Sequence, residues 1–297
     1  MPVFLDRALV SGAGGFVGSA LVAHLEVTQG RLRMGAADWM EQLQSTDFRD
    51  ATVFHLAARV HADDDDDPAF LHDNVEKTHA LARAARRGGA RRFIFLSSVK
   101  VNGEESRARP FTRADAPRPL DAYARSKAKA EEALATMTGL DTVIVRSPLV
   151  YGAGVKGNLL ALLHLADSPW PLPFAALANR RSFVHVDDLA RLLIDCAMRP
   201  EAVGRMYFAS HSHAVSTREL VAGMRAALSR PPRLFRVSPG VLEAGAVLAG
   251  QRERIKRLTR SLEVDSSDAT RELGWNAQIG FETALDDMVS AYRQLAP

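Results

Sequence analysis

Three residues of this sequence have the types and the spacing of a proton-transfer site. Tyr123 stands four residues before Lys127, and Ser98 stands 25 residues before the tyrosine. Side chains four residues apart share one helix face, so the lysine would lie beside the tyrosine and lower its pKa from about 10. The serine hydroxyl could then hold a substrate oxygen. This set predicts a nicotinamide-dependent redox enzyme.

A glycine-rich turn near the N-terminus indicates where a nucleotide cofactor would bind. The turn contains Gly12, Gly15 and Gly18. It follows a short apolar stretch, Arg7 to Ser11, and precedes a helical pattern from Phe16 to Glu26. This spacing lets the backbone approach a pyrophosphate at a helix N-terminus, where free N–H groups attract anions. The turn predicts dinucleotide binding, although glycines alone also suit an ordinary tight turn.

Apolar runs and helical patterns alternate along the chain, which predicts the elements that position these residues. After the first strand, further buried strands are expected at 52–56, 92–96 and 142–145, and helices at 69–87 and 122–138. Strands that alternate with helices favour an α/β fold with a doubly wound parallel sheet, the Rossmann fold. Ser97 and Ser98 would directly follow one of these strands, at the edge where such sheets bind ligands.

The sequence also predicts two departures from a plain Rossmann domain. Between the first helix and the strand at 52–56 there is one candidate strand, Arg31 to Ala36, where two would be usual. After Tyr151 the pattern changes to loops and helices, which predicts a smaller C-terminal substrate lobe. We expect residues 1–165 and 182–210 to form the dinucleotide-binding domain and residues 166–181 and 211–297 to form that lobe.

Composition excludes several classes of protein. The 297 residues are 47% hydrophobic and 25% charged, with a net charge of +3, and the basic residues are spread along the chain. We therefore expect no nucleic-acid partner. The single cysteine, Cys196, excludes disulfides within the chain, and no apolar run reaches the roughly 18 residues that a membrane span needs. These features predict a cytoplasmic protein with no membrane partner, and no residue cluster predicts a metal.

Eight segments carry a resemblance to a known family. They are SGAGGFVG (11–18), HLAA (55–58), NVEKT (74–78), FLSSVKVNG (95–103), YARSK (123–127), RSPLVYG (146–152), RRSFVHVDDLA (180–190) and VDSSDATRELGW (264–275). In this order and spacing the chain resembles the extended short-chain dehydrogenases/reductases, in the branch of NAD-dependent nucleotide-sugar epimerases, dehydratases and 4-ketoreductases. The resemblance covers nearly the whole length.

The resemblance implies a role for particular residues. It implies that Tyr123 and Lys127 are the catalytic pair and that Ser98 polarises the sugar oxygen. The implied cofactor-binding residues are Gly12, Gly15, Phe16, Val17, Gly18, Asp38, Ala57, Ala58 and Asn74, together with Tyr123 and Lys127. The implied substrate-binding residues are Ser98, Lys100, Asn158, Arg181, Phe183 and Arg254. Arg181 would hold a nucleotide diphosphate, because its planar fork suits phosphate oxygens.

The choice between NAD and NADP depends on the shortened segment after the first helix. Asp38 lies 20 residues after Gly18 and could accept a hydrogen bond from the ribose 2′-OH of NAD. Arg33 could instead contact the 2′-phosphate of NADP. NAD is the expected cofactor, and NADP is not excluded by these residues.

The expected activity is hydride transfer at C4 of a UDP-hexose or UDP-N-acetylhexosamine, in polysaccharide precursor synthesis. The enzyme would be either a 4-epimerase or a 4-keto-sugar reductase. The alternatives are a dehydrogenase of a non-nucleotide alcohol and a non-catalytic protein that senses a dinucleotide. The resemblance also implies a homodimer that pairs the helices carrying Asn74 and Tyr123, although the small residues on those helices suit core packing equally well.

Overall fold

A computed structural model describes residues 6–25, 28–32, 38–60, 67–248 and 250–295 of the chain. Its main part is a six-stranded sheet with all neighbouring strands parallel, in the order β2-β1-β3-β4-β5-β8. These strands are β1 (Arg7–Ser11), β2 (Thr28–Leu32), β3 (Thr52–His55), β4 (Arg92–Ser98), β5 (Asp141–Ser147) and β8 (Met206–Phe208). The predicted doubly wound parallel sheet is confirmed.

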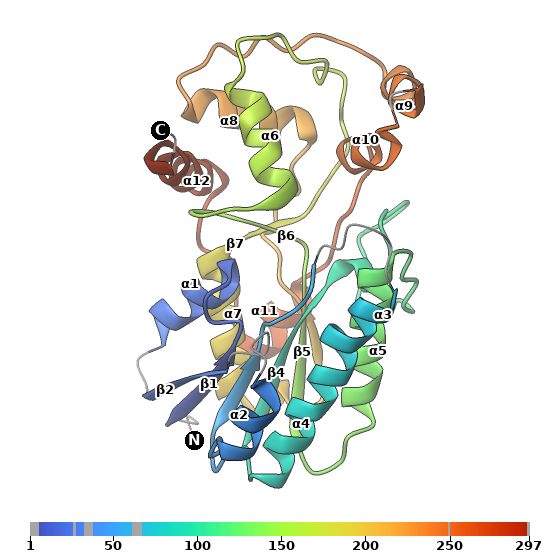
Figure 1. The fold of residues 1–297 in the computed structure, drawn as a ribbon. Helices are drawn as coiled ribbons and strands as arrows, with labels where there is room; N and C mark the ends of the chain where they lie inside the picture. The colour runs from blue at the N-terminus through green and yellow to red at the C-terminus, as the bar shows by residue number, and fades with distance from the viewer. Residues whose placement is uncertain (1–5, 26–27, 33–37, 61–66, 249, 296–297) are drawn as a thin grey trace.

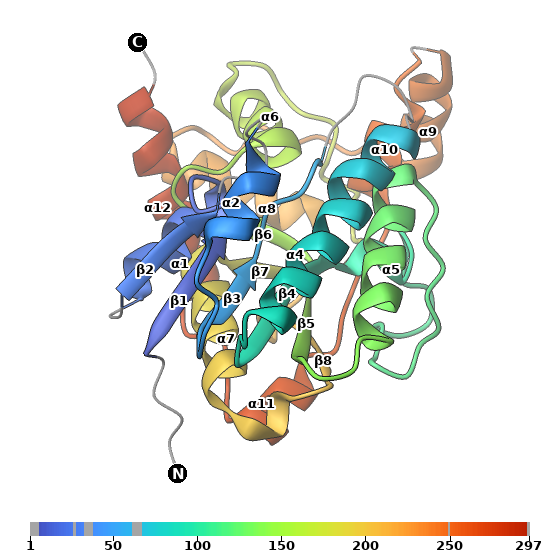
Figure 2. The same cartoon turned by 60° about the horizontal axis from the view of Figure 1, so that its bottom comes forward.

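Helices cover both faces of this sheet (Figures 1 and 2). One layer contains α1 (Phe16–His24), α7 (Val186–Met198) and α11 (Ser267–Leu273). The other contains α2 (Trp39–Ser45), α4 (Lys77–Arg87) and α5 (Ala122–Ala135). Because both faces are covered, the central strands bury consecutive side chains, and all four residues of β3 are buried.

The smaller lobe lies beyond the carboxyl ends of the strands (Figure 1). It contains α6 (Gly157–Asp167), α8 (Thr217–Ala227), α9 (Pro239–Leu248), α10 (Arg252–Thr259) and α12 (Phe281–Leu295). A two-stranded parallel sheet of β6 (Leu149–Tyr151) and β7 (Phe183–His185) joins this lobe to the main part. The predicted boundary at residue 165 falls inside α6, which packs against α8, and the exact division of the chain remains a prediction.

Several predicted element boundaries were wrong by a few residues. The strand expected at 31–36 is β2, which begins at Thr28 because it pairs with β1 from Arg7 onward. β4 continues through Ser98, since its last residues pair with β5, so Ser97 and Ser98 end the strand rather than follow it. α1 ends at His24 and α5 at Ala135, whereas the helical patterns suggested 26 and 138.

The shortened segment between β2 and β3 adds no further strand to the sheet within its described residues, 38–51. Among the described residues of this segment, α2 is the only helix or strand, and β2 is the outer strand beside β1. Gly30 lets β2 lie close to β1, because a Cβ at this position would meet Leu9 Cδ2 at 2.5 Å. The prediction of one strand where two are usual is thus confirmed within the described residues.

The helix expected at 69–87 is interrupted by a wider turn. α3 (Asp67–Phe70) continues into a π-helical segment, Leu71–Glu76, before α4 begins. The π segment contains Asn74, which is buried. Single π turns inside longer helices often occur at functional sites.

Candidate functional site

The predicted catalytic hydroxyls lie together at the carboxyl edge of the sheet. Ser98 is the last residue of β4, and Tyr123 is in the first turn of α5. Burial raises the pKa of Tyr123 to about 12, the Asp121 carboxylate adds to the rise, and a hydrogen bond with the Ser98 side chain lowers it. In this structure the phenol is therefore protonated at neutral pH and already paired with the serine.

Lys127 lies one turn further along α5, and its ammonium contacts β4. Its ammonium donates a hydrogen bond to the Leu96 carbonyl at 2.8 Å and lies 4.3 Å from the ring centroid of Phe95. Asp121 and Ser98, not Lys127, are the groups that shift the pKa of Tyr123 besides burial. The β4 carbonyl holds the Lys127 ammonium in this structure, and the role of Lys127 in lowering the pKa of Tyr123 remains a prediction.

The burial of Lys127 gives the protein a pH-dependent stability. Burial lowers the pKa of Lys127 from 10.5 to about 7, so between these values the unfolded chain carries a proton that the folded protein has released. The free energy of unfolding should therefore rise with pH in this window. We expect it to rise by roughly 2 kcal/mol more between pH 7 and 9 in wild type than in Lys127→Met.

Urea unfolding at the two pH values measures this difference. The matched control is Lys129→Met, which removes an exposed lysine from the same helix and should keep the wild-type pH dependence. An equal pH dependence in Lys127→Met and wild type would show that the Lys127 ammonium keeps an ordinary pKa in the folded protein.

A buried ion pair that the sequence did not reveal fixes α5 against the sheet. Arg146 on β5 donates two hydrogen bonds to the Glu131 carboxylate of α5, at 2.9 and 2.5 Å. Ser97 donates to the same carboxylate at 2.5 Å, and Arg146 also donates to the Asn102 side chain at 2.8 Å. The network joins the strand that carries Ser98 to the helix that carries Tyr123. Arg146, Ser97 and Asn102 belong to segments that carry the family resemblance, but nothing in those segments indicated that Arg146 pairs with Glu131.

The glycine turn packs directly against the loop after β3. Gly12 has a φ of +76°, and a Cβ there would meet the Ala57 nitrogen at 2.7 Å. A Cβ at Gly18 would meet the Gly12 carbonyl oxygen at 2.0 Å. Gly15 is the N-cap of α1 and gives the helix no side-chain cap. The turn thus leaves the α1 N-terminus free of side chains, which fits a pyrophosphate, and Phe16 and Val17 are half-buried just beyond it.

These contacts predict different effects for two neighbouring glycines. Gly18→Ala should weaken NAD binding by at least about tenfold, because the new methyl group would displace the Gly12 backbone. Gly14→Ala is the matched control, since a Cβ at Gly14 would meet nothing within 4 Å. Calorimetric titration of both variants with NAD makes the comparison. Equal affinities would contradict the assignment of this turn to the cofactor.

Asn74 and His55 hold the other side of the predicted cofactor groove. The Asn74 amide donates to the Arg59 carbonyl and to Ser126 Oγ, each at 2.9 Å, and accepts from the Arg59 nitrogen at 2.7 Å. It therefore ties the loop that carries Ala57 and Ala58, both half-buried, to α5. Buried His55 lies 2.5 Å from Ser11 Oγ and 2.7 Å from Thr78 Oγ1, as expected for a hydrogen-bonded wall residue.

The residues that would distinguish NAD from NADP are only partly described. Asp38 is exposed at the N-cap of α2, and its carboxylate accepts a hydrogen bond from the Gln42 side chain at 2.8 Å. Arg33 lies outside the described residues. The position of Asp38 after β2 is compatible with its predicted contact to the cofactor ribose, and that contact remains a prediction.

A cavity of about 850 Å³ extends from the Ser98 and Tyr123 hydroxyls into the smaller lobe. Its volume is in the range typical of small-molecule sites. Ser98 and Tyr123 line it, together with the predicted substrate residues Lys100, Asn158, Arg181 and Phe183. Arg254 is exposed on α10 and is not among the lining residues, whereas Arg257 is. The structure thus brings together every predicted substrate residue except Arg254, and Arg257, about one helical turn further along α10, lines the cavity instead.

Arg181 is a buried cation with an unsatisfied hydrogen-bonding group. Its backbone pairs with Val215 on one side and Leu262 on the other, which holds the side chain at the cavity wall. One guanidinium nitrogen donates to the Arg260 carbonyl at 3.1 Å, but its buried Nε has no partner in the described structure. Burial and then Arg257 lower the pKa of Arg181 to about 10. An anion placed between Arg181 and Arg257 would accept a hydrogen bond from the unpaired Nε and offset the positive charge of both side chains.

Lys100 differs from Arg181 because acidic side chains already surround it. Its ammonium forms a very short ion pair with Asp121 and lies 3.3 Å from Glu104. Asp121 also caps α5 by accepting a hydrogen bond from the Ala124 nitrogen at 2.7 Å. Lys100 therefore fits a neutral, hydroxyl-rich substrate group better than a second phosphate.

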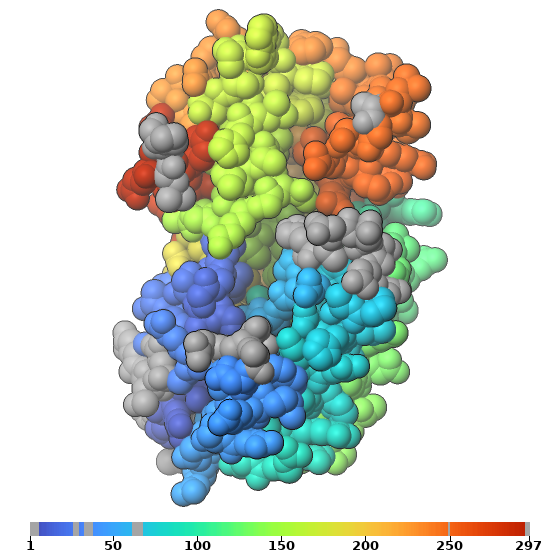
Figure 3. Space-filling view, viewed as in Figure 1, coloured from blue at the N-terminus to red at the C-terminus, as the bar shows by residue number. Residues whose placement is uncertain are grey.

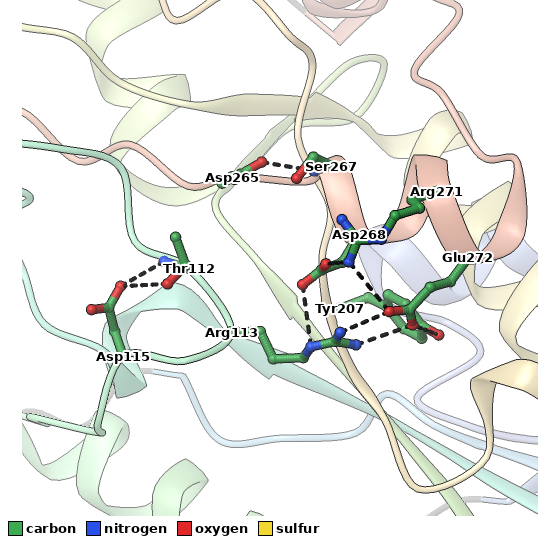
Figure 4. A network of polar contacts seen from close by, with 9 residues as sticks. All are labelled: Thr112, Arg113, Asp115, Tyr207, Asp265, Ser267, Asp268, Arg271 and Glu272. Carbon is green, nitrogen blue, oxygen red and sulfur yellow. Dashed lines mark hydrogen bonds and ion pairs between the residues drawn. The ribbon is translucent and has the colours of Figure 1, made fainter.

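The long loop between Ser98 and Tyr123 is anchored to α11 (Figure 4). Arg113 in this loop donates two hydrogen bonds to Glu272, at 2.7 and 3.1 Å, and lies 3.2 Å from Asp268. The Tyr207 hydroxyl donates to the same glutamate at 2.8 Å. The late VDSSDATRELGW segment thus holds the loop that connects Ser98 to Tyr123.

Two classes of site are not found in the described parts of the chain. No group of three or more His, Cys, Asp or Glu side chains there could hold a metal ion. None of the helices described is long and apolar enough to cross a bilayer.

Comparisons with known proteins agree with this geometry. The model of the NAD dependent epimerase/dehydratase family matches residues 8–208. A UDP-glucose 4-epimerase from Vibrio cholerae is 33% identical over 312 residues, which cover 96% of this chain and 95% of the relative. A UDP-2-acetamido-2,6-beta-L-arabino-hexul-4-ose reductase from Pseudomonas aeruginosa is 27% identical over 199 residues, which cover 62% of this chain and 48% of the relative.

Among solved structures, MoeE5 in complex with UDP-glucose and NAD superimposes with a TM-score of 0.75. It is 25% identical, and the match covers 97% of this chain and 99% of that one. The family match across the sheet and the full-length similarity to a sugar epimerase agree with the glycine turn and the Ser98–Tyr123 pair. The chain belongs to the NAD-dependent epimerase/dehydratase family.

Proposed function

We propose that this protein uses NAD to move a hydride at C4 of a UDP-hexose or UDP-N-acetylhexosamine. The observation that carries the proposal is that one cavity is lined both by the Ser98 and Tyr123 hydroxyls and by buried Arg181 with its unpaired Nε. A sugar would accept hydrogen bonds from the two hydroxyls, and a diphosphate would accept a hydrogen bond from the unpaired Nε of Arg181. The relatives described as acting on UDP-sugars support the same substrate class.

In this proposal each group has one task. NAD, when bound, accepts the C4 hydride and can return it. Tyr123 donates its proton to O4 when a 4-keto sugar is reduced, its phenolate accepts the O4 proton when C4 is oxidised, and Ser98 donates a hydrogen bond to O4. Arg181 and Arg257 bind the diphosphate, while Asn158, Phe183 and Lys100 contact the rest of the substrate. The turn of Gly12, Gly15 and Gly18 binds the pyrophosphate of the cofactor at the α1 N-terminus, beside Ala57, Ala58 and Asn74.

The first candidate is a 4-epimerase, because the Vibrio cholerae relative matches nearly the full length of both chains. The second is a 4-keto-sugar reductase, which the shorter match to the Pseudomonas aeruginosa reductase supports. An epimerase recovers its hydride in each cycle and can keep NAD bound. A reductase must exchange spent cofactor with solution.

Two measurements distinguish these candidates. Proton NMR would follow UDP-glucose and UDP-N-acetylglucosamine with the purified protein, and chromatography would identify any dinucleotide released on denaturation. Conversion at C4 with NAD bound and none added would establish an epimerase. Oxidation of added NADH or NADPH by a UDP-4-keto sugar would establish a reductase. Failure of both, together with no UDP contact in saturation-transfer NMR, would favour a non-nucleotide alcohol as substrate.

Two adjacent arginines give a direct test of the diphosphate site. Arg181→Met should weaken UDP binding by about 10- to 100-fold, because a charge-assisted hydrogen bond and a buried cation are lost. Arg180→Met is the matched control, since the Arg180 side chain is 58% exposed and pairs with Glu263 outside the cavity. Calorimetric titration with UDP measures both variants. Unchanged affinity in Arg181→Met would remove the basis for a nucleotide diphosphate at this position.

We also propose that the protein is a cytoplasmic homodimer. The two helices that would form the contact, α4 and α5, lie side by side on the outer face of the main part (Figure 2). Ala135 on α5 is exposed and is therefore available for a dimer contact, whereas Ala84 on α4 is buried in the core. Light scattering at micromolar concentration would decide, and a monomer would exclude the dimer under those conditions.

A further inference from the structure

The α9 helix presents an apolar face to the outside of the molecule. Val241 and Leu248 are 63% and 91% exposed, and Ala244 and Gly245 between them are also exposed. These four residues recur at i, i+3, i+4 and i+7, so they share one helix face. The opposite face packs against the protein: Ala246 is buried, and Glu243 accepts a hydrogen bond from Thr259 of α10 at 2.7 Å. The helix is therefore apolar on both sides, with one apolar side packed on the protein and the other turned outward.

Positive charge is concentrated around this helix. From Arg233 to Arg260 the sequence contains seven Lys or Arg residues and two Glu residues, while the whole chain has a net charge of only +3. The rest of the chain is thus slightly acidic. Arg236, Arg252 and Arg254 are exposed, and none has an ion-pair partner within the described structure. These three arginines lie within six residues of α9 in the sequence, whereas Lys256 and Arg260 form ion pairs and Arg257 lines the cavity.

We propose that α9 and its flanking arginines dock this protein onto an anionic lipid bilayer. Binding of a surface helix to a membrane interface increases with the apolar area that it buries and with the attraction of nearby basic residues to anionic lipids. Each arginine near an anionic surface adds to the attraction. A ten-residue helix lying parallel to the surface needs no membrane span. This proposal replaces the expectation, drawn from the sequence, that the protein has no membrane partner.

A second copy of the chain fits this face less well. A symmetric dimer through α9 would bring the same surface of both copies together. It would therefore place two strongly basic segments against each other, and like charges in contact repel. An anionic bilayer instead complements the arginines and covers the apolar residues. Charge thus favours the lipid surface over self-association.

Docking would place the substrate cavity close to the bilayer. α9 forms the outer corner of the smaller lobe, and α10 packs against it on the inner side (Figures 1 and 3). α10 in turn contributes Glu253, Arg257 and Leu258 to the cavity wall. α10, which contacts α9, therefore also lines the proposed active site.

Vesicle co-sedimentation tests the proposal with the full-length protein. We expect wild type to sediment with vesicles of equal phosphatidylglycerol and phosphatidylcholine, and to remain in the supernatant with pure phosphatidylcholine. The double variant Val241→Ser/Leu248→Ser should bind the anionic vesicles at least about tenfold more weakly, because two apolar side chains no longer enter the interface. Arg236→Gln/Arg252→Gln should reduce both the binding and its dependence on salt.

The control is Met40→Ser, which removes a side chain that is 49% exposed on α2, in the main part of the molecule. It should bind vesicles like wild type, and thermal unfolding checks that each variant is folded. The proposal is overturned if wild type ignores the anionic vesicles or if Val241→Ser/Leu248→Ser binds them equally well. It is also overturned if Val241→Ser/Leu248→Ser leaves vesicle binding unchanged but lowers the molecular mass of the protein in solution, measured by light scattering. The α9 face would then contact a second copy of the chain.

Discussion

Replacing Tyr123 with phenylalanine should lower kcat by about a hundred- to ten-thousand-fold, the usual effect of removing a group that transfers a proton in the transition state. The variant keeps the aromatic ring, whose contact with Phe70 has a centroid distance of 6.4 Å, and it loses the hydroxyl that pairs with Ser98. Binding of UDP should change little, because Arg181 and not Tyr123 is expected to bind the diphosphate. The measurement is steady-state turnover with the UDP-sugar that NMR identifies.

A second tyrosine provides the control for this experiment. The Tyr292 hydroxyl on α12 lies 3.2 Å from Asp167 and is not among the residues that line the cavity. Tyr292→Phe removes the same atom and should leave kcat within about twofold, since surface changes away from a site have small effects. Full turnover in Tyr123→Phe would exclude this phenol as the proton-transfer group, even if the substrate class is correct.

Replacing Arg146 with methionine should lower the free energy of unfolding by about 3–5 kcal/mol, because Glu131 would remain buried without its partner. Both side chains are strongly buried, with exposures of 6% for Arg146 and 9% for Glu131. Urea denaturation followed by circular dichroism measures the change. A loss below about 1 kcal/mol would mean that water or another cation reaches the carboxylate.

The double variant Arg146→Met/Glu131→Leu separates the charge from the packing. It removes both charges and keeps apolar volume, so it should regain a large part of the stability that Arg146→Met loses. Activity need not return with stability, because Ser97 also donates to Glu131 and the pair joins β4 to α5. A stable double variant with low kcat would indicate that the ion pair positions Tyr123 relative to Ser98.

Much of the fold could be predicted because its signals are local. β1, β3, β4 and β5 are short apolar runs between helical patterns, and a parallel sheet covered on both faces buries consecutive residues. The boundaries were less predictable, since pairing with a neighbouring strand decides them. β4 extends through Ser98 because Ser98 pairs with Ser147 of β5, and nothing in the local pattern marks that extension.

The residues at the centre of the site were also predictable from the sequence. Glycine spacing, the Tyr–Lys pair and the serine at a strand end are short motifs whose chemistry requires those residue types. Ser98, Tyr123 and Arg181 line one cavity, although more than 80 residues separate the first from the last. Their meeting follows from the parallel sheet, because the carboxyl ends of its strands share one edge.

The sequence by itself determined the α/β class and the family to which the chain belongs, and it predicted which hydroxyls would transfer a proton. Only the tertiary structure decided that the Lys127 ammonium binds Leu96, that Glu131 pairs with Arg146, and that α9 turns an apolar face outward. It also placed Arg257 rather than Arg254 at the cavity. The physical reason is that burial and the direction of a side chain depend on elements distant in sequence, whereas motif chemistry depends on a few neighbouring residues.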